Sequence, residues 1–91
     1  MCILNRVKEV LKLPNKAYND IMKGNDKNIK FSDLCYVLNK AGFCCRIKGD
    51  HYIFTREDIP EIINIQPDGN KAKPYQVRQA RLLFQKYNII I

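Results

Sequence analysis

Two strand-like runs, residues 43–48 and 51–56, are separated by only Gly49 and Asp50. A two-residue connection that begins with glycine is typical of a β-hairpin closed by a type II′ turn. Because the connection is this short, it allows the two strands a single register. Side chains alternate between the faces of a strand, so the register decides which of them can face a core. The predicted pairs are residue 48 with 51, 47 with 52, 46 with 53, and 45 with 54.

This register divides the hairpin into an apolar face and a polar face. We expect the apolar face to be buried under helices; it carries Phe43, Cys45, Ile47, Tyr52 and Phe54. We expect the polar face to stay open to solvent; it carries Cys44, Arg46, Lys48, His51, Ile53 and Thr55. His51 is the single histidine of the chain, and it should lie directly across from Lys48 and diagonal to Arg46.

The segments around the hairpin supply the other elements of a small fold. Ser32 is the expected N-cap of a helix over residues 33–41, which carries an apolar stripe and stops at Gly42. Residues 61–66 form a third strand-like run, and residues 67–74 form a loop rich in glycine and proline.

A last helix is expected to start at Pro74, since proline is favoured in the first turn of a helix. The order of helix, three-stranded antiparallel sheet and helix predicts an α+β domain with both helices on one face of the sheet. The residues of the last helix expected to face inward are Val77, Ala80, Phe84 and Tyr87, and those expected to face outward are Arg78, Arg81 and Lys86.

The N-terminal part of the chain is interpreted as a helical extension over residues 1–28, separable from a domain over residues 29–91. Its apolar residues recur at helical spacing, interrupted by proline and glycine. The expected parts are a helix over residues 3–12 that ends at Pro14, a second helix from Asn15 to about residue 23, and a polar linker over residues 24–30.

The charge balance narrows the choice of partner. The net charge is +7 over 91 residues, and the isoelectric point is about 9.4. Such a basic domain favours nucleic acid as a partner, and the alternative is a charge that serves only solubility. No run approaches the roughly 20 apolar residues of a membrane span, and polar residues interrupt the N-terminal segment. We therefore expect a cytoplasmic protein without a membrane partner.

The four cysteines predict neither a metal site nor a disulfide framework. They are Cys2, Cys35, Cys44 and Cys45, and they form no CxxC pair and no ligand spacing with His51. We expect buried or half-buried free thiols, and we expect no metal and no small-molecule cofactor.

The predicted position of His51 suits cleavage of RNA. An imidazole exchanges a proton readily near neutral pH, and cations beside it can bind a phosphate and stabilise added charge. RNA supplies its own nucleophile in the 2′-hydroxyl, so a proton acceptor with a cationic surround is sufficient without metal. The alternative is that His51 is only a polar residue on a solvated face.

Three stretches, "FSDLCYVLNKAGF", "RIKGDHYIF" and "EIINIQPDGNKAKPYQVRQARLLFQKYNI", resemble the HicA family of bacterial toxins over about residues 29–89. The resemblance implies a double-stranded-RNA-binding-domain-like fold, mRNA interferase activity and a HicB-like antitoxin as partner. The catalytic histidine of the family's Gly-x-His motif falls on His51. Two features depart from the family pattern. Asp50 stands where a small hydroxyl residue is usual, and residues 1–28 exceed the minimal domain.

The same resemblance suggests where phosphates bind. In a domain shaped like a double-stranded-RNA binder, the loop before the last helix and the start of that helix meet phosphates. The residues at those places are Lys71, Lys73 and Arg78. The alternative is an ordinary solvated loop.

Two further functions compete with that of an endoribonuclease toxin. One is a non-catalytic RNA-binding module in which His51 contacts a base or ribose. The other is a toxin-derived protein that retains only antitoxin binding, because the carboxylate of Asp50 repels phosphate or favours the imidazolium.

Overall fold

The computed structural model describes the backbone of residues 13–91 and the side chains of residues 16–91. The helix expected over residues 3–12 lies outside the described residues. The helix expected from Asn15 is observed, and it begins at Leu13. The elements in chain order are α1 (Leu13–Lys23), the short 3₁₀ helix η2 (Asp26–Asn28), α2 (Phe31–Lys40), β1 (Cys44–Lys48), β2 (His51–Arg56), β3 (Ile59–Ile65), β4 (Pro67–Asp68), β5 (Lys71–Ala72) and α3 (Pro74–Lys86).

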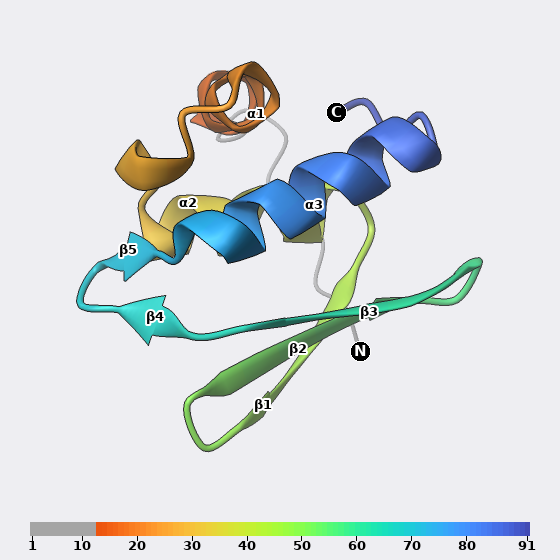
Figure 1. Cartoon of the computed structure of the whole chain (residues 1–91). Coiled ribbons are helices and arrows are strands. Elements are labelled where there is room, and N and C mark those ends of the chain that lie inside the picture. Colours follow the sequence, from red (N-terminus) through yellow and green to blue (C-terminus); the bar gives the residue numbers. More distant parts are fainter. Residues whose placement is uncertain (1–12) are drawn as a thin grey trace.

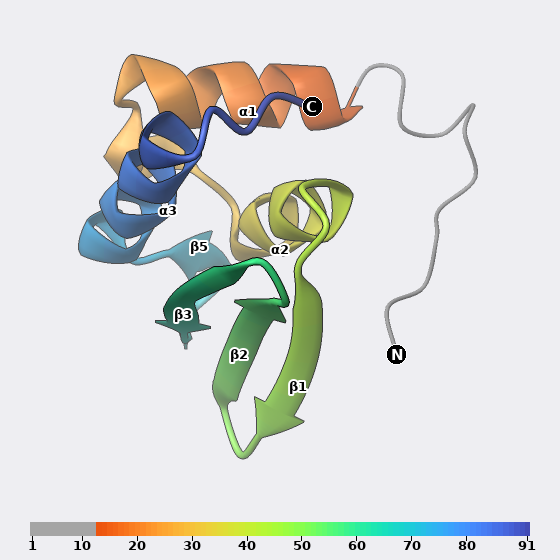
Figure 2. The same ribbon diagram turned by 90° about the vertical axis from the view of Figure 1, so that its right-hand side faces the viewer.

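The predicted α+β class is confirmed. The strands β1, β2 and β3 form one antiparallel sheet in that order, with α2 before it and α3 after it in the chain. Both helices lie on one side of the sheet, and α1 crosses them on the side away from it (Figures 1 and 2). The opposite face of the sheet is left uncovered by the described residues, and we call it the open face.

The hairpin has the predicted register. Its pairs run from Cys44 with Thr55 to Lys48 with His51. Gly49 has a φ of +64°, whereas Asp50 does not have a positive φ. A type I′ turn needs positive φ at both central residues and a type II′ turn only at the first, so these angles support type II′.

The core lies between the sheet and the helices, and every layer contributes to it. Apolar side chains at helical spacing in α2 and α3 meet alternate side chains of β2 and β3. Fully buried members include Leu34 and Leu38 of α2, Phe54 of β2, Ile63 and Ile65 of β3, and Val77 of α3, with Phe43 just before β1.

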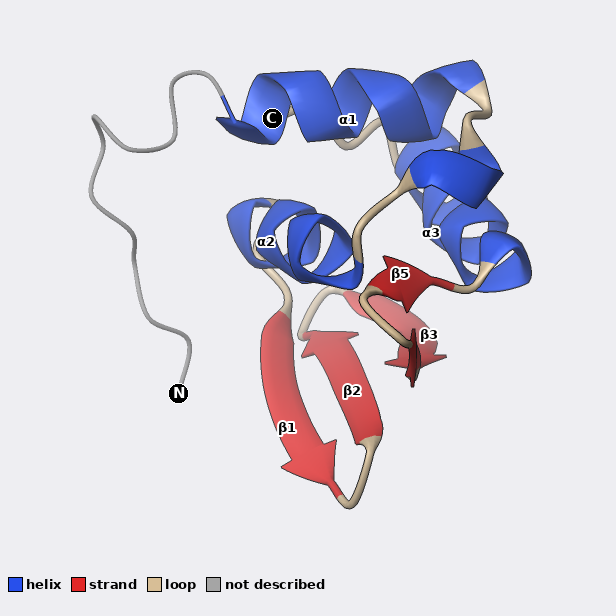
Figure 3. Cartoon of the chain, turned by 90° about the vertical axis from the view of Figure 1, so that its left-hand side faces the viewer, coloured by secondary structure: helices blue, strands red, loops and turns tan. Residues whose placement is uncertain are grey.

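The outer half of the hairpin departs from the prediction. Phe43 and Phe54 are buried as expected and Tyr52 is half-buried, but Cys45 and Ile47 are exposed, and Ile47 retains 58% of its accessible surface. The reason is the length of the hairpin relative to the helices. Strand β1 is an edge strand, and the end of the hairpin projects beyond the helical layer (Figure 3).

The start of α2 also differs from the prediction. The helix begins at Phe31 after Lys30, so Ser32 is inside the helix and is not its N-cap. Backbone pairing with a later segment sets this boundary, since Phe31 N–H donates to the Asn70 carbonyl at 3.0 Å and Ala72 N–H donates to the Ile29 carbonyl at 2.9 Å. The expected linker therefore contains a buried residue, Ile29. The expected loop over residues 67–74 contains the short strands β4 and β5.

A bidentate ion pair joins the N-terminal helical segment to α3. Arg81 was expected to face outward, but its guanidinium binds both carboxylate oxygens of Asp26, at 2.6 and 3.3 Å. It also donates to the Ile21 carbonyl at 3.1 Å. The expectation of an outward Arg81 is wrong because η2 folds back over α3 and meets it. Ala17 and Ile21 belong to the same core as the sheet.

A second ion pair ties the end of α3 to β3 and predicts a pH dependence of stability. Glu61 accepts from Lys86 Nζ and from Tyr87 Oη, each at 2.6 Å. These hydrogen bonds lower the pKa of Glu61 from 4.5 to about 2. A carboxyl whose pKa falls on folding stabilises the protein above its unfolded pKa, and this stabilisation is lost as pH falls toward the folded value.

We therefore expect Glu61→Gln to lower the melting temperature at pH 7. The difference from wild type should shrink as pH falls from about 4.5 toward 2, because protonation removes the same charge from the wild-type protein. Thermal melts across this pH range measure it. The control is Glu57→Gln, which removes an exposed carboxylate that has no ion pair within the described chain. A difference that stays constant with pH would contradict the prediction.

Candidate nucleic-acid interface

His51 begins strand β2 and lies on the open face, where its side chain is 47% exposed. Its Nδ1 is 3.1 Å from Oδ1 of Asn64, on the neighbouring strand β3. Its Nε2 is 3.4 Å from the amide nitrogen of Gln66 and 3.8 Å from a carboxylate oxygen of Asp50. Each ring nitrogen therefore has an amide side chain beside it, and Nε2 also lies near a carboxylate.

Two of the predicted cations lie beside His51 on the same face. Lys48 pairs directly with His51, and Arg46 pairs with Ile53, which places it diagonal to the imidazole. Both side chains are exposed, and neither forms an ion pair within the described chain. Other lysines without an ion pair lie on the side of the sheet that the helices cover. Lys48 and Arg46 differ from them because they lie on the open face. Among residues 16–91, the cations that do form ion pairs with carboxylates are Lys16, Arg56, Arg81 and Lys86.

The three other predicted phosphate contacts come from the segment around the start of α3. Lys73 directly precedes that helix, and its Nζ lies 3.4 Å from Oε1 of Gln66, so it is linked to His51 through one side chain. Lys71 on β5 and Arg78 on α3 are exposed. No hydrogen bond among residues 16–91 connects either of them with His51. The fold thus brings Lys73 to the imidazole and leaves Lys71 and Arg78 as flanking charges.

Two amide side chains contact His51, a third binds the backbone that carries them, and sequence reasoning missed all three. Asn64 lies in β3 and Gln66 directly follows the last residue of that strand, and both are on the face that carries His51. Gln76, in the first turn of α3, is the one buried polar residue of the described chain, at 3% exposure. Polar residues at positions 64 and 66, which alternate with Ile63 and Ile65, were a usable signal, because the period of two places them on one face.

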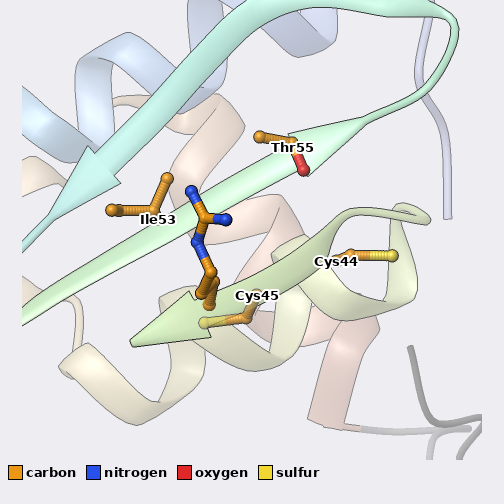
Figure 4. A pocket seen from close by; sticks show the side chains of 5 residues that line it. Cys44, Cys45, Ile53 and Thr55 are labelled. Atoms are coloured by element: carbon orange, nitrogen blue, oxygen red, sulfur yellow. The ribbon is translucent and has the colours of Figure 1, made fainter. Parts of the chain in front are cut away.

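A shallow pocket extends the open face along the hairpin. Figure 4 shows Ile53 and Thr55 of β2 beside Cys44 and Cys45 of β1, and Arg46 completes the lining. Arg46 therefore belongs both to this pocket and to the group of cations around His51. The combination of apolar side chains with a guanidinium suits a ligand that has both an apolar surface and a negative charge.

The described cysteines take three different states. Cys35 is a half-buried free thiol, and burial raises its pKa to about 12. Cys45 is an exposed free thiol, and desolvation raises its pKa as well. Cys44 is disulfide-bonded, so the expectation of a free thiol is wrong there. Within residues 16–91, no group of three His, Cys, Asp or Glu residues is placed to hold a metal ion.

The arrangement of these elements defines the class of the protein. A helix, a three-stranded antiparallel sheet and a second helix on the same face are the order of a double-stranded-RNA-binding-domain-like fold. No helix in the described part of the chain is long and apolar enough to cross a membrane.

The chain belongs to the HicA toxin family of bacterial toxin–antitoxin systems, whose family profile matches residues 31–84, more than half of the 91 residues. The resemblance read from the sequence is thereby confirmed. Neither the curated proteins nor the solved structures give a significant match. The protein is therefore a toxin of a toxin–antitoxin system, and its partner is an antitoxin.

Proposed function

We propose that this toxin is an endoribonuclease that cleaves mRNA without a metal ion, with His51 as its acid–base group. The observation that carries the proposal is the open face, where an exposed imidazole lies across from Lys48 and diagonal to Arg46. Both cations lack a carboxylate partner within the described chain, so their charge is available to a phosphate. Because mRNA is a cytoplasmic substrate, we place the action of the toxin in the cytoplasm.

The proposed reaction uses the 2′-hydroxyl of the RNA as its nucleophile. Nε2 of His51 takes the hydroxyl proton, the 2′-oxygen attacks phosphorus, and the bond from phosphorus to the 5′-oxygen breaks. The products are a 2′,3′-cyclic phosphate and a 5′-hydroxyl. Lys48 and Arg46 stabilise the charge that gathers on the phosphoryl oxygens in the transition state.

The leaving 5′-oxygen takes a proton from Lys48 or from water. Tyr52 is excluded from this role by its position, because its ring packs edge-on against Phe31 of α2 at 4.9 Å, on the covered side of the sheet. The pocket that Arg46 shares with Ile53 supports binding of a neighbouring nucleotide, with its base on the apolar side chains.

We propose that residues 29–91 form the unit that binds and cleaves RNA and that residues 1–28 are a helical extension. All the proposed site residues fall in the first of these ranges. Lys71, Lys73 and Arg78 bind phosphates on either side of the cleaved bond, at the start of α3, where the helix dipole also favours anions.

Binding to RNA is expected to depend strongly on salt. For single-stranded RNA, log K falls with log salt by roughly 0.7 for each phosphate neutralised, so about four phosphates give a slope near −3. Titrations at several salt concentrations measure this slope. Lys48→Gln should reduce it, whereas Lys16→Gln should not, because Lys16 lies on α1 and pairs with Asp20. A flat salt response in the wild-type protein would show that the basic face does not bind RNA.

The test of the proposed function is incubation of the purified toxin with end-labelled mRNA in the presence of EDTA. We expect discrete fragments that end in a cyclic phosphate. Binding without fragments would favour the non-catalytic RNA-binding module. A toxin-derived protein in which Asp50 has impaired the site would be favoured by two results together. These are that the protein does not bind RNA and that its expression without the antitoxin does not arrest growth.

We propose that the partner is a HicB-like antitoxin and that it inhibits by covering the open face. Such an antitoxin would bury His51 and present acidic groups to Lys48 and Arg46, since complementary charge speeds association and occupies the phosphate sites. A structure of the complex tests this, and a solvent-exposed His51 in it would contradict the proposal.

A further inference from the structure

The orientation of Gln66 is determined by the groups at its two ends. Its Oε1 is 3.4 Å from Lys73 Nζ, and an ammonium can only donate hydrogen bonds. Its Nε2 is 3.4 Å from Oδ2 of Asp50, and a carboxylate can only accept them. The amide therefore presents oxygen to Lys73 and nitrogen to Asp50. If the oxygen and nitrogen of the amide were exchanged, a donor would face Lys73 and an acceptor would face Asp50, so neither hydrogen bond could form.

This orientation determines the tautomer of the neutral His51 side chain. The Gln66 amide nitrogen, which can only donate, is also 3.4 Å from His51 Nε2, so Nε2 acts as an acceptor and carries no proton. The proton of the neutral ring is then on Nδ1, which donates to Asn64 Oδ1 at 3.1 Å. The ring nitrogen left with a lone pair is Nε2.

A buried side chain holds the strand that carries these amides. Gln76 of α3 accepts from the backbone N–H of Gln66 at 3.0 Å and donates to the backbone carbonyl of Asn64 at 3.4 Å. Its Nε2 also lies 3.2 Å from Tyr75 Oη. The end of β3 is thus joined to the first turn of α3, so the positions of Asn64 and Gln66 are set by the packing of the helix.

We infer that Asn64 is a positioning residue for the reaction, which holds His51 in the Nδ1-protonated tautomer, so that Nε2 carries the lone pair that takes the proton of the RNA 2′-hydroxyl. Gln66, oriented by Lys73, supports the same tautomer from the other side of the ring. A neutral imidazole has two tautomers, and only the one with an unprotonated Nε2 can take up a proton at that nitrogen. The inference rests on the proposed function and adds to it the group that orients the base.

The experiment compares Asn64→Ala and Asn64→Asp with wild type in cleavage of a labelled RNA across a range of pH, with RNA affinity measured alongside. General acid–base assistance contributes about 10² to 10⁴ in rate. We expect Asn64→Ala to lose about 10- to 100-fold of kcat, with unchanged RNA affinity. Asn64→Asp retains an acceptor for Nδ1–H, so we expect it to recover activity at high pH. Its carboxylate favours the imidazolium, so the rising limb of its pH–rate profile should move to higher pH.

Two controls separate this inference from neighbouring explanations. Asn39→Ala removes an exposed side chain of the same type on α2, on the covered side of the sheet, and Asn19→Asp adds the same charge on α1, far from the sheet. Both should cleave as wild type does, with an unchanged pH profile. His51→Ala serves as the reference for the proposed function itself.

The possible outcomes decide between the explanations. If His51→Ala is inactive while Asn64→Ala cleaves at the wild-type rate, the positioning role is wrong and the proposed function stands. Equal losses in both Asn64 variants with an unshifted pH profile would also overturn the role, because they indicate a structural effect. A loss confined to RNA affinity would make Asn64 a binding residue. If His51→Ala remains active, the proposed function itself fails.

Discussion

Replacing His51 with alanine is expected to abolish RNA cleavage while leaving the fold and the RNA affinity nearly unchanged. The side chain lies on the open face and is about half exposed, so its removal creates no core cavity. Substitutions of this kind usually change the free energy of unfolding by no more than about 0.5 kcal/mol. The cations that bind phosphate, Lys48 and Arg46, stay in place. General acid–base assistance is worth about 10² to 10⁴ in rate, which is sufficient to make a slow toxin inert.

The measurement for His51→Ala has three parts: melting temperature, RNA affinity and fragment production in EDTA. Asn39→Ala is the control, because it truncates an exposed polar side chain on α2, away from the open face. Near wild-type cleavage by His51→Ala would place the nuclease site elsewhere. A large fall in affinity would instead assign His51 a role in binding.

Replacing Phe84 with alanine is expected to destabilise the whole fold by about 3–5 kcal/mol. The ring is 1% exposed in the core between α3 and the other layers, and it lies 5.6 Å from the ring of Tyr18 on α1. Its loss removes apolar burial and leaves a cavity under two helices. Small domains unfold with only about 5–15 kcal/mol, so one such change removes a large part of the stability.

Thermal and urea denaturation measure the effect of Phe84→Ala. At about 4–8 °C per kcal/mol for a domain of this size, the melting temperature should fall by at least about 12 °C. The matched control is Leu82→Ala on the same helix, where the side chain is 53% exposed and the expected change is within about 0.5 kcal/mol. Similar losses in the two variants would show that the assignment of core and surface on α3 is wrong.

Local sequence was sufficient to predict the hairpin. A two-residue Gly-Asp turn admits one register, and the period of two along a strand then places His51, Lys48 and Arg46 on one face. The short turn and the alternation of side chains both act within a few residues of the chain, so no other element was needed to predict the register and the shared face. The α+β order was predictable for the same reason, since it follows from apolar periodicities of 3.6 and 2. The family could be read from motifs in the same segments.

Contacts between distant segments were not predictable in this way. The first residue of α2 is set by pairing of Ile29 and Phe31 with residues 70 and 72, which are about 40 positions away in the chain. The inward direction of Arg81 depends on Asp26, which reaches it only after η2 folds back. The exposure of Ile47 depends on how far the helical layer extends over the hairpin.

The contacts of the amides around His51 are also contacts between distant segments of the chain. The sequence by itself determined that an imidazole and two cations share an open face, because a short turn and strand alternation are sufficient for that. Only the tertiary structure decided which ring nitrogen donates and which accepts, because Asn64 comes from β3, Gln66 directly follows that strand and Gln76 comes from α3. Their positions depend on the pairing of β3 with β2 and on the packing of α3. These are long-range contacts, and no local pattern along the chain specifies their distances.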